Sequence, residues 1–348
     1  MHNKKYKILI AGHDLKFFQT IFEYGSNYSN IRWIIDKWDN HTVHDEKASL
    51  EKLDEVDIVF CEWGLGNILF FSNHIKSDQK LYVRIHLQEL RVPYLGDVSW
   101  ENVSGVFFVA EWVRDAFAEQ IWNSTIRKEM LEKSHYVPNV VNPAKFYPKK
   151  FSPLANRKLN FGMLGAIMKR KGQLKAINLY HNVKNNFPEE TGDFFIQGHR
   201  SHDLKWMSQE DKEHEENLLA YIEKNNIAKH VHFLPHGDPL SFFDVVDIII
   251  SMSDFESFHY SIPDGMLRGC LPMIRGWTGA ERFYPSQYIF ESDNQFEKLY
   301  SSFLKSIDPF LLYKNRSYII ERFGPSKIIP KLFSLMNISL KPHVKTLL

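Results

Sequence analysis

The sequence predicts an α/β protein with two doubly wound domains, each built on a parallel sheet between helices. The chain has 348 residues, more than one hydrophobic core usually organises, so two domains of about 150 to 170 residues are expected. In both halves, short apolar runs rich in isoleucine and valine alternate with segments of helical periodicity. Residues 136–153 contain four prolines and divide the two halves near the middle of the chain.

The first half follows this alternation from its start. Residues 6–12 predict a buried strand, and residues 14–24 predict a helix with apolar side chains at helical spacing. Further strands are expected at residues 31–35, 56–61, 80–86 and 103–110. The first strand ends at a single glycine, Gly12, where a dinucleotide-binding loop needs three. This pattern disfavours a nicotinamide-dependent dehydrogenase.

The second half repeats the alternation more regularly. Strands are expected at residues 158–165, 193–198, 230–235, 247–251, 271–275 and 287–290, with helices at 172–183 and 215–225. The acidic run 209–217 is typical of a solvated helix start, where carboxylates favour the helix dipole, rather than of a metal site. The tail, residues 295–340, is expected to be helical with breaks at Pro309, Pro325 and Pro330.

Composition narrows the class of protein. Hydrophobic residues make up 44% of the chain, enough for two cores, and the formal net charge is +1, which argues against a nucleic-acid-binding protein. Cys61 and Cys270 are the only cysteines, which excludes a disulfide framework and favours the reducing cytosol. The first apolar run is too short for a signal peptide, and no run reaches the roughly 18 residues of a membrane span. We therefore expect a cytoplasmic protein.

The stretch from residue 251 to residue 276 carries the strongest functional signal. A polar crossing with Glu256 follows the isoleucine-rich strand, and Pro263 is suited to the first turn of a helix, which places Asp264 there. Ligands of open α/β sheets bind at the carboxyl ends of strands, and helix N-termini attract phosphate. Taken alone, however, two carboxylates eight positions apart around a loop are also typical of a solvated turn.

This stretch resembles the donor-site signature of retaining glycosyltransferases of family 4, which belong to the GT-B class. That signature has two glutamates separated by seven residues, then a small-residue helix, a glycine and a proline. The chain has Glu256 and Asp264 at these places, followed by Gly265, Met266, Gly269 and Pro272. The second carboxylate is one methylene shorter than in the family.

The resemblance implies the GT-B architecture, with two Rossmann-like domains that face each other across a cleft. Residues 1–147 would form the acceptor-binding domain and residues 148–325 the nucleotide-sugar-binding domain. Residues 326–348 would form a helix that packs back on the first domain. The order Pro138, Asn139, Asn142 and Phe146 matches the family's interdomain element, although an ordinary linker has a similar composition.

Residues 162–173 carry a second signal. Transfer from a nucleotide diphosphate sugar places negative charge on the leaving diphosphate, and cations, a metal or a helix N-terminus must stabilise it. The chain has no Asp-x-Asp pair, so cationic side chains are expected to do this without a metal. Gly165, Lys171 and Gly172 match the family pattern, but its arginine position is Ala166, and Lys169 or Arg170 would have to substitute. The alternative is a solvated helix start.

His86 resembles the acceptor-domain histidine of the family, which lies at a strand end and contacts the donor sugar. The alternative is a histidine that is satisfied by a backbone carbonyl. The loop at residues 63–67 would be either an acceptor-facing loop or, more simply, a turn. The resemblance thus implies catalytic roles for His86, Lys171 and Glu256. The donor-binding candidates are Gly12, Gly165, Arg170, Lys171, Phe258, Ser261 and Asp264.

The expected function is retaining transfer of a hexose-type sugar from a nucleotide diphosphate sugar to a glycan, lipid-linked or protein acceptor, in surface polysaccharide or glycoconjugate synthesis. No cofactor besides this donor substrate is expected. Two alternatives stay open: a GT-B subunit that binds nucleotide sugar or glycan without turnover, and a GT-B epimerase of nucleotide sugars. Peripheral contact with the inner face of the membrane is a further expectation, through an aromatic and basic set, although a helix with such a face is more often core on one side and solvent on the other: Trp112, Arg114, Phe117, Trp122, Arg127 and Lys128.

Overall fold

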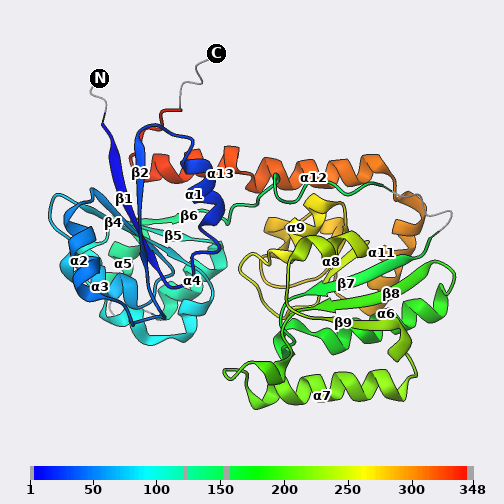
Figure 1. Ribbon diagram of the computed structural model, residues 1–348. Helices are drawn as coiled ribbons and strands as arrows, with labels where there is room; N and C mark the ends of the chain where they lie inside the picture. Colours follow the sequence, from blue (N-terminus) through cyan, green and yellow to red (C-terminus); the bar gives the residue numbers. More distant parts are fainter. Residues whose placement is uncertain (1–3, 121–123, 152–156, 343–348) are drawn as a thin grey trace. The chain divides into compact units, whose positions relative to one another are not determined.

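The computed structural model describes residues 4–120, 124–151 and 157–342 (Figure 1). The chain divides into two compact units. The first ends at Val140 and includes the chain from Arg322 onward, and the second runs from Val141 to Glu321. The first unit thus ends before the expected boundary at residue 147. Contacts within the second unit explain this, because Arg316 donates to the Pro143 carbonyl at 2.9 Å and Arg268 to the Tyr147 carbonyl at 2.7 Å.

The first unit is built on a six-stranded sheet with the order β2-β1-β3-β4-β5-β6, in which all pairings are parallel. Its strands are β1 Tyr6–Gly12, β2 Ile31–Lys37, β3 Ile58–Glu62, β4 Lys80–Ile85, β5 Gly105–Phe108 and β6 Ser134–Tyr136. Its helices are α1 Gln19–Gly25, α2 Glu46–Asp54, α3 Gly66–His74, α4 Glu111–Gln120, α5 Ser124–Glu132 and α13 Pro325–Leu335. Short 3-10 helices at Gln88–Arg91, Pro93–Asp97 and Trp100–Asn102 follow β4. Every residue of β3 is buried, as expected for a central strand of a parallel sheet.

Helix α13 belongs to the core of the first unit and lies beside α1 (Figure 1). Four of its side chains, Ile328, Ile329, Leu332 and Phe333, are buried in the same cluster as strands β1 and β3. Pro330 lies inside this helix, so the predicted break there is wrong. A proline in a helix interior costs about 3 kcal/mol, whereas each large apolar side chain gains about 1.5–3 kcal/mol when fully buried. Packing therefore outweighs the proline.

The second unit has another all-parallel sheet, with the order β12-β11-β10-β7-β8-β9. Its strands are β7 Leu159–Leu164, β8 Thr191–Gln197, β9 Val231–Leu234, β10 Ile248–Ser251, β11 Leu271–Arg275 and β12 Ile289–Phe290. Its helices are α6 Gln173–Asn186, α7 Gln209–Lys224, α8 Pro239–Val245, α9 Ser261–Arg268, α10 Ala280–Phe283, α11 Asp293–Ser306 and α12 Pro309–Phe323. In Figure 1, α8 and α9 lie on one side of this sheet, and α6 and α7 lie on the other. Two parallel sheets flanked by helices confirm the predicted α/β fold.

Helix α7 begins earlier than residue 215, where the apolar periodicity placed its start. Ser208 caps it by accepting from the Asp211 backbone N–H at 3.1 Å, and Asp211 accepts in return from the Ser208 backbone. The acidic run therefore forms the first turns of the helix. Capping decides the start because it satisfies N–H groups that apolar periodicity does not register.

No helix within the described ranges is both long and apolar enough to cross a membrane. Of the residues considered for peripheral contact, Phe117 is buried in the first unit, and Trp122 lies outside the described residues. Arg114 pairs with its neighbour Asp115 at 2.9 Å. Membrane contact stays a prediction.

Candidate active site

The segment between β10 and β11 folds as its pattern predicts. Strand β10 is buried throughout, and α9 follows after an irregular crossing. Asp264 lies in the first turn of α9, but the helix begins at Ser261, so Pro263 is its third residue. Gly269 ends the helix in the left-handed conformation, with φ 98°. Such a C-terminal glycine closes the helix without steric cost and lets the chain turn into β11.

A second loop, between β7 and α6, lies against this crossing. Lys169–Lys171 forms one turn of 3-10 helix, and Gly172 then adopts φ 71°. A Cβ atom at Gly172 would lie 2.7 Å from the Met252 carbonyl oxygen, so the close approach requires glycine. The Asp254 backbone N–H donates to the Arg170 carbonyl at 2.9 Å. These contacts bring the two predicted motifs together.

Glu256 is the centre of the combined site, and only 7% of its surface is exposed. Its Oε1 accepts from Ser253 Oγ at 2.8 Å and from Arg170 Nη1 at 3.2 Å, and it forms an ion pair with the Lys171 ammonium. Burial opposes the charge, but His259, Lys171 and Arg170 hold the pKa of Glu256 well below its usual range. Glu256 therefore stays ionised at neutral pH.

The three cations of the Lys169–Lys171 turn have different partners. Lys169 points away and pairs with Glu210 at 3.0 Å, with 62% of its side chain exposed. The side chains of Arg170 and Lys171 are 27% and 15% exposed. Burial lowers the pKa of Lys171, and Glu256 opposes this shift. Arg170, rather than Lys169, is thus the cation that joins Lys171 at the site.

His259 is part of this site, and sequence reasoning missed it. Its backbone has φ 54°, and its Nδ1 lies 2.8 Å from Ser251 Oγ at the end of β10. Burial and the nearby Lys171 lower the pKa of His259 to about 3, so the imidazole is neutral at physiological pH. Its place three residues after Glu256 was a signal, but its backbone conformation is not visible in any periodicity.

The remaining donor-binding candidates, in the crossing and in α9, differ in accessibility. Phe258 is 1% exposed and packs in an aromatic cluster with Tyr260 and Phe283, with ring centroids 5.0 Å and 5.7 Å away. Ser261 is 5% exposed, and its buried Oγ has no hydrogen-bond partner among the residues that the structure describes. Burial raises the pKa of the half-buried Asp264 well above its usual range, with Lys145 opposing the shift. Ser261 and Asp264 have the unsatisfied polar groups that a ligand would need.

Two candidate glycines show how closely the backbone approaches its neighbours. Gly165 has φ 136°, and a Cβ atom at Gly198 would lie 2.2 Å from the Gly165 carbonyl oxygen. In the first unit, a Cβ atom at Gly12 would lie 2.7 Å from the Glu62 carbonyl oxygen. The backbone geometry therefore explains why glycine occupies positions 12 and 165, whether or not these residues also bind a donor. At the family's arginine position, the Ala166 carbonyl accepts from Gln173 Nε2 at 3.0 Å.

His86 lies in the first unit and is 2% exposed. Its Nε2 lies 3.0 Å from Glu62 Oε1, and its ring centroid lies 4.1 Å from that of Trp63. Arg84 binds both carboxylate oxygens of Glu62, at 2.9 Å and 2.7 Å. The imidazole is thus satisfied by a buried carboxylate, where the sequence-based alternative named a backbone carbonyl. The loop after β3 continues directly into α3, which begins at Gly66.

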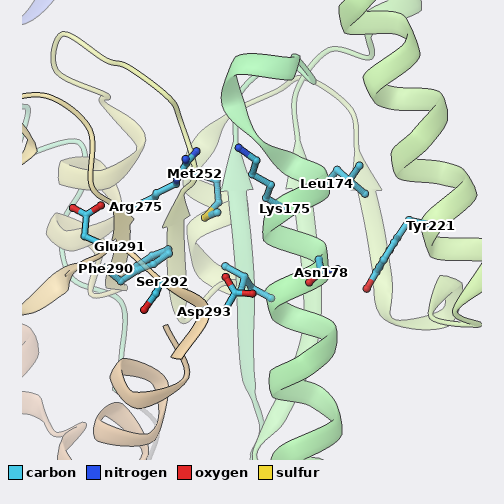
Figure 2. A pocket seen from close by; sticks show the side chains of 11 residues that line it. Leu174, Lys175, Asn178, Tyr221, Met252, Arg275, Phe290, Glu291, Ser292 and Asp293 are labelled. Carbon is cyan, nitrogen blue, oxygen red and sulfur yellow. The ribbon is translucent and has the colours of Figure 1, made fainter. Parts of the chain in front are cut away.

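A pocket of about 400 Å³ lies next to the crossing in the second unit (Figure 2). Met252, Lys175 and Arg275 lie close together at one end of it, and Tyr221 projects from α7 at another. Asp254 pairs with Arg275 at 2.7 Å and with Lys175 at 3.7 Å. Asp254 and Glu256 therefore each hold a different pair of cations. Among the residues described, no group of three or more His, Cys, Asp or Glu side chains could hold a metal ion.

Comparison with solved structures relates the fold to known enzymes. The chain is similar to TarM, with 16% identity over 85% of this chain and a TM-score of 0.62, and it spans 59% of the TarM chain. It is similar to Anabaena HepE in complex with UDP-glucose, with 12% identity, a TM-score of 0.69, and 95% of this chain and 99% of that one covered. It also resembles a trehalose-6-phosphate synthase that was studied for glycosyl transfer with retention, with 10% identity, a TM-score of 0.68, and 97% and 100% covered.

These likenesses show the GT-B fold alone. The sequence identities are too low for the activity of these proteins to be carried over to this chain. No protein-family model and no curated sequence matches the chain. The predicted GT-B fold is confirmed.

Proposed function

We propose that this protein is a retaining glycosyltransferase that uses a nucleotide diphosphate sugar as donor. The observation that carries the proposal is the convergence of Arg170, Lys171 and Glu256 at the carboxyl edge of the second parallel sheet. The two half-buried cations, next to the N-terminus of α9, suit a leaving diphosphate, and the carboxylate suits a sugar hydroxyl. The complexes of HepE with UDP-glucose support this choice of donor class.

The reaction follows from these side chains. The acceptor oxygen forms a bond to the anomeric carbon on the face from which the diphosphate leaves, and the bond between that carbon and the phosphate oxygen breaks. The proton of the acceptor hydroxyl passes to the departing diphosphate. Arg170 and Lys171 stabilise the charge that develops on the diphosphate, without a metal, and Glu256 accepts hydrogen bonds from sugar hydroxyls.

Asp264 is assigned to the ribose hydroxyls. Its carboxylate has no hydrogen bond from any residue that the structure describes, and it lies in the first turn of α9 beside the unsatisfied Ser261 hydroxyl. The hexose-type sugar, the glycan or lipid-linked acceptor and the role in surface polysaccharide or glycoconjugate synthesis belong to the proposal as well. Their support is the resemblance of the Glu256 to Pro272 motif.

A binding subunit without turnover is the second candidate. Ala166 at the family's arginine position favours it, because one cation of the usual pair is missing from that backbone position. Arg170 reaches Glu256 from another position, which favours the enzyme instead. Product analysis separates the two.

The test is incubation of the protein with UDP-, GDP- and ADP-glucose in EDTA, after a thermal-shift screen of the same donors. A donor at about a hundred times its Kd adds about 2.7 kcal/mol of stability. Slow donor hydrolysis, or transfer to an added glycan, supports the enzyme. Binding without turnover supports the second candidate, and an isomerised sugar indicates an epimerase. Activity that EDTA removes and magnesium restores would overturn metal independence.

A further inference from the structure

His259 has a left-handed backbone conformation, with φ 54°, which residues other than glycine adopt uncommonly. Four non-glycine residues in the described part of the chain have positive φ: Trp63, Asn226, His259 and Asn337. Asn226 and Asn337 follow the ends of α7 and α13, where asparagine commonly takes this conformation. His259 instead occupies an irregular crossing inside the candidate site. Unfavourable backbone conformations of this kind persist where the surrounding structure imposes them, and they cluster at functional sites.

The side chain of His259 is oriented by the end of β10. Its Nδ1 lies 2.8 Å from Ser251 Oγ, and Ser251 is fully buried. A buried hydroxyl needs an acceptor, and Nδ1 is the acceptor found for Ser251 among the described residues. If Ser251 donates to Nδ1, the imidazole carries its proton on Nε2. No partner for Nε2 is found within the described ranges.

The surroundings of Nε2 favour an anionic ligand. Within the described part of the chain, the charged groups that act on His259 are two cations, Lys171 and Arg170, and one carboxylate, Glu256. A neutral imidazole can donate a hydrogen bond there without adding a third positive charge. The unsatisfied Ser261 hydroxyl, two residues further on, is another donor at the start of α9.

We propose that His259 is a donor-positioning residue whose Nε2–H donates to a phosphate oxygen of the nucleotide diphosphate. This inference rests on the proposed function and adds a contact that the resembling motif does not supply. The strained crossing holds the imidazole at the phosphates together with Arg170 and Lys171. Glycine at this position would relieve the backbone strain but could not bind the ligand. The unfavourable conformation is therefore retained because the histidine side chain binds the ligand.

The test measures the binding of UDP, GDP and ADP, and of the matching nucleosides, by calorimetry. His259→Gly keeps the left-handed backbone available, so we expect about 10- to 100-fold weaker binding of the nucleoside diphosphate, with nucleoside binding unchanged. If His259 had a purely structural role, the substitution would weaken the binding of the nucleoside diphosphate and of the nucleoside equally. Asn226→Gly is the matched control, because it relieves the same backbone conformation in the same unit and should leave diphosphate affinity unchanged.

The outcomes separate this inference from the proposed function. Wild-type affinity for the diphosphate in His259→Gly overturns the role of His259 alone. Equal weakening of diphosphate and nucleoside binding overturns it as well. If the wild-type protein binds none of the three diphosphates, the proposed function fails and this inference fails with it.

Discussion

The Arg170 guanidinium lies 3.2 Å from the Glu256 carboxylate, although the two residues are 86 positions apart in the chain. Lys171 pairs with the same oxygen, whereas Lys169 turns away to Glu210. One carboxylate therefore pairs with two cations, so the group of three side chains keeps a net positive charge. That charge is what a leaving diphosphate requires.

The sharpest comparison uses two neighbouring lysines. Lys171→Ala removes a half-buried cation beside Glu256, so turnover should fall by roughly a hundredfold or more. Lys169→Ala removes an exposed cation of the same turn that pairs with Glu210, and turnover should stay at the wild-type level. Steady-state rates with the donor that binds best decide this. Equal rates in the two variants would remove Lys171 from the site.

Glu256→Gln should lower both stability and turnover. The substitution leaves Arg170 and Lys171 facing each other without a carboxylate, and loss of one partner of a buried ion pair costs about 3–5 kcal/mol. Combining it with Lys171→Met should cost less than the sum of the single changes, because the two residues are coupled. Urea unfolding of the single and double variants measures this. Additive losses would contradict the ion pair.

Asp264→Asn should separate stability from binding. Because burial raises the pKa of Asp264, its charged form is disfavoured in the folded protein, and the stability due to the protonated form is lost as pH rises. The Asn variant should therefore be at least as stable as wild type at pH 7. Its binding of the nucleoside diphosphate should weaken by about 1.5 to 3 kcal/mol. Unchanged affinity would show that the ribose is held elsewhere.

Stability should decline as the solution is acidified below about pH 6.5. The folded-state pKa of His259 is about 3, against an ordinary value of 6.5, and the pKa of Glu256 lies well below 4.5. Both pKa values are depressed on folding, so both groups contribute stability that is present above the unfolded-state pKa and lost as pH falls. Between pH 6.5 and 4.5 the decline should be shallower in His259→Gly than in wild type.

Other histidines add to this slope, and His214 is one whose pKa burial also lowers. They act in both proteins, so the difference between the variant and wild type isolates His259. Asn226→Gly provides the baseline for a glycine substitution. Identical slopes in all three proteins would show that His259 is not held neutral by the fold.

His86→Gln tests whether the first unit takes part in catalysis. If His86 acts on the donor sugar, turnover should fall at least tenfold while the affinity for the nucleoside diphosphate stays unchanged. Its hydrogen bond to Glu62 can be kept by the glutamine amide, so the fold should survive. Wild-type turnover together with a lower Tm would leave His86 as a partner of the buried Glu62 and nothing more.

Much of the fold follows from local pattern. Residues 271–275 were predicted as a strand and form β11 with the same bounds, and the isoleucine run before Ser251 forms β10. Such runs can be predicted from the sequence because a strand buried on both faces needs apolar side chains at every position. A related reason makes three candidate site residues predictable, namely Glu256, Asp264 and Lys171. Strand ends and helix starts in a parallel sheet place their side chains at one edge.

Only the tertiary structure decided which side chains meet there. The turn from Lys169 to Gly172 directs Arg170 and Lys171 to Glu256 and sends Lys169 to α7, and no spacing rule distinguishes these three neighbours. The left-handed backbone of His259 lies in the irregular crossing between β10 and α9, where no periodicity predicts a backbone conformation. His86 meets Glu62 because β3 and β4 pair side by side. Local sequence encodes periodicity and turn chemistry, whereas the direction of a loop side chain depends on distant residues that pack against it.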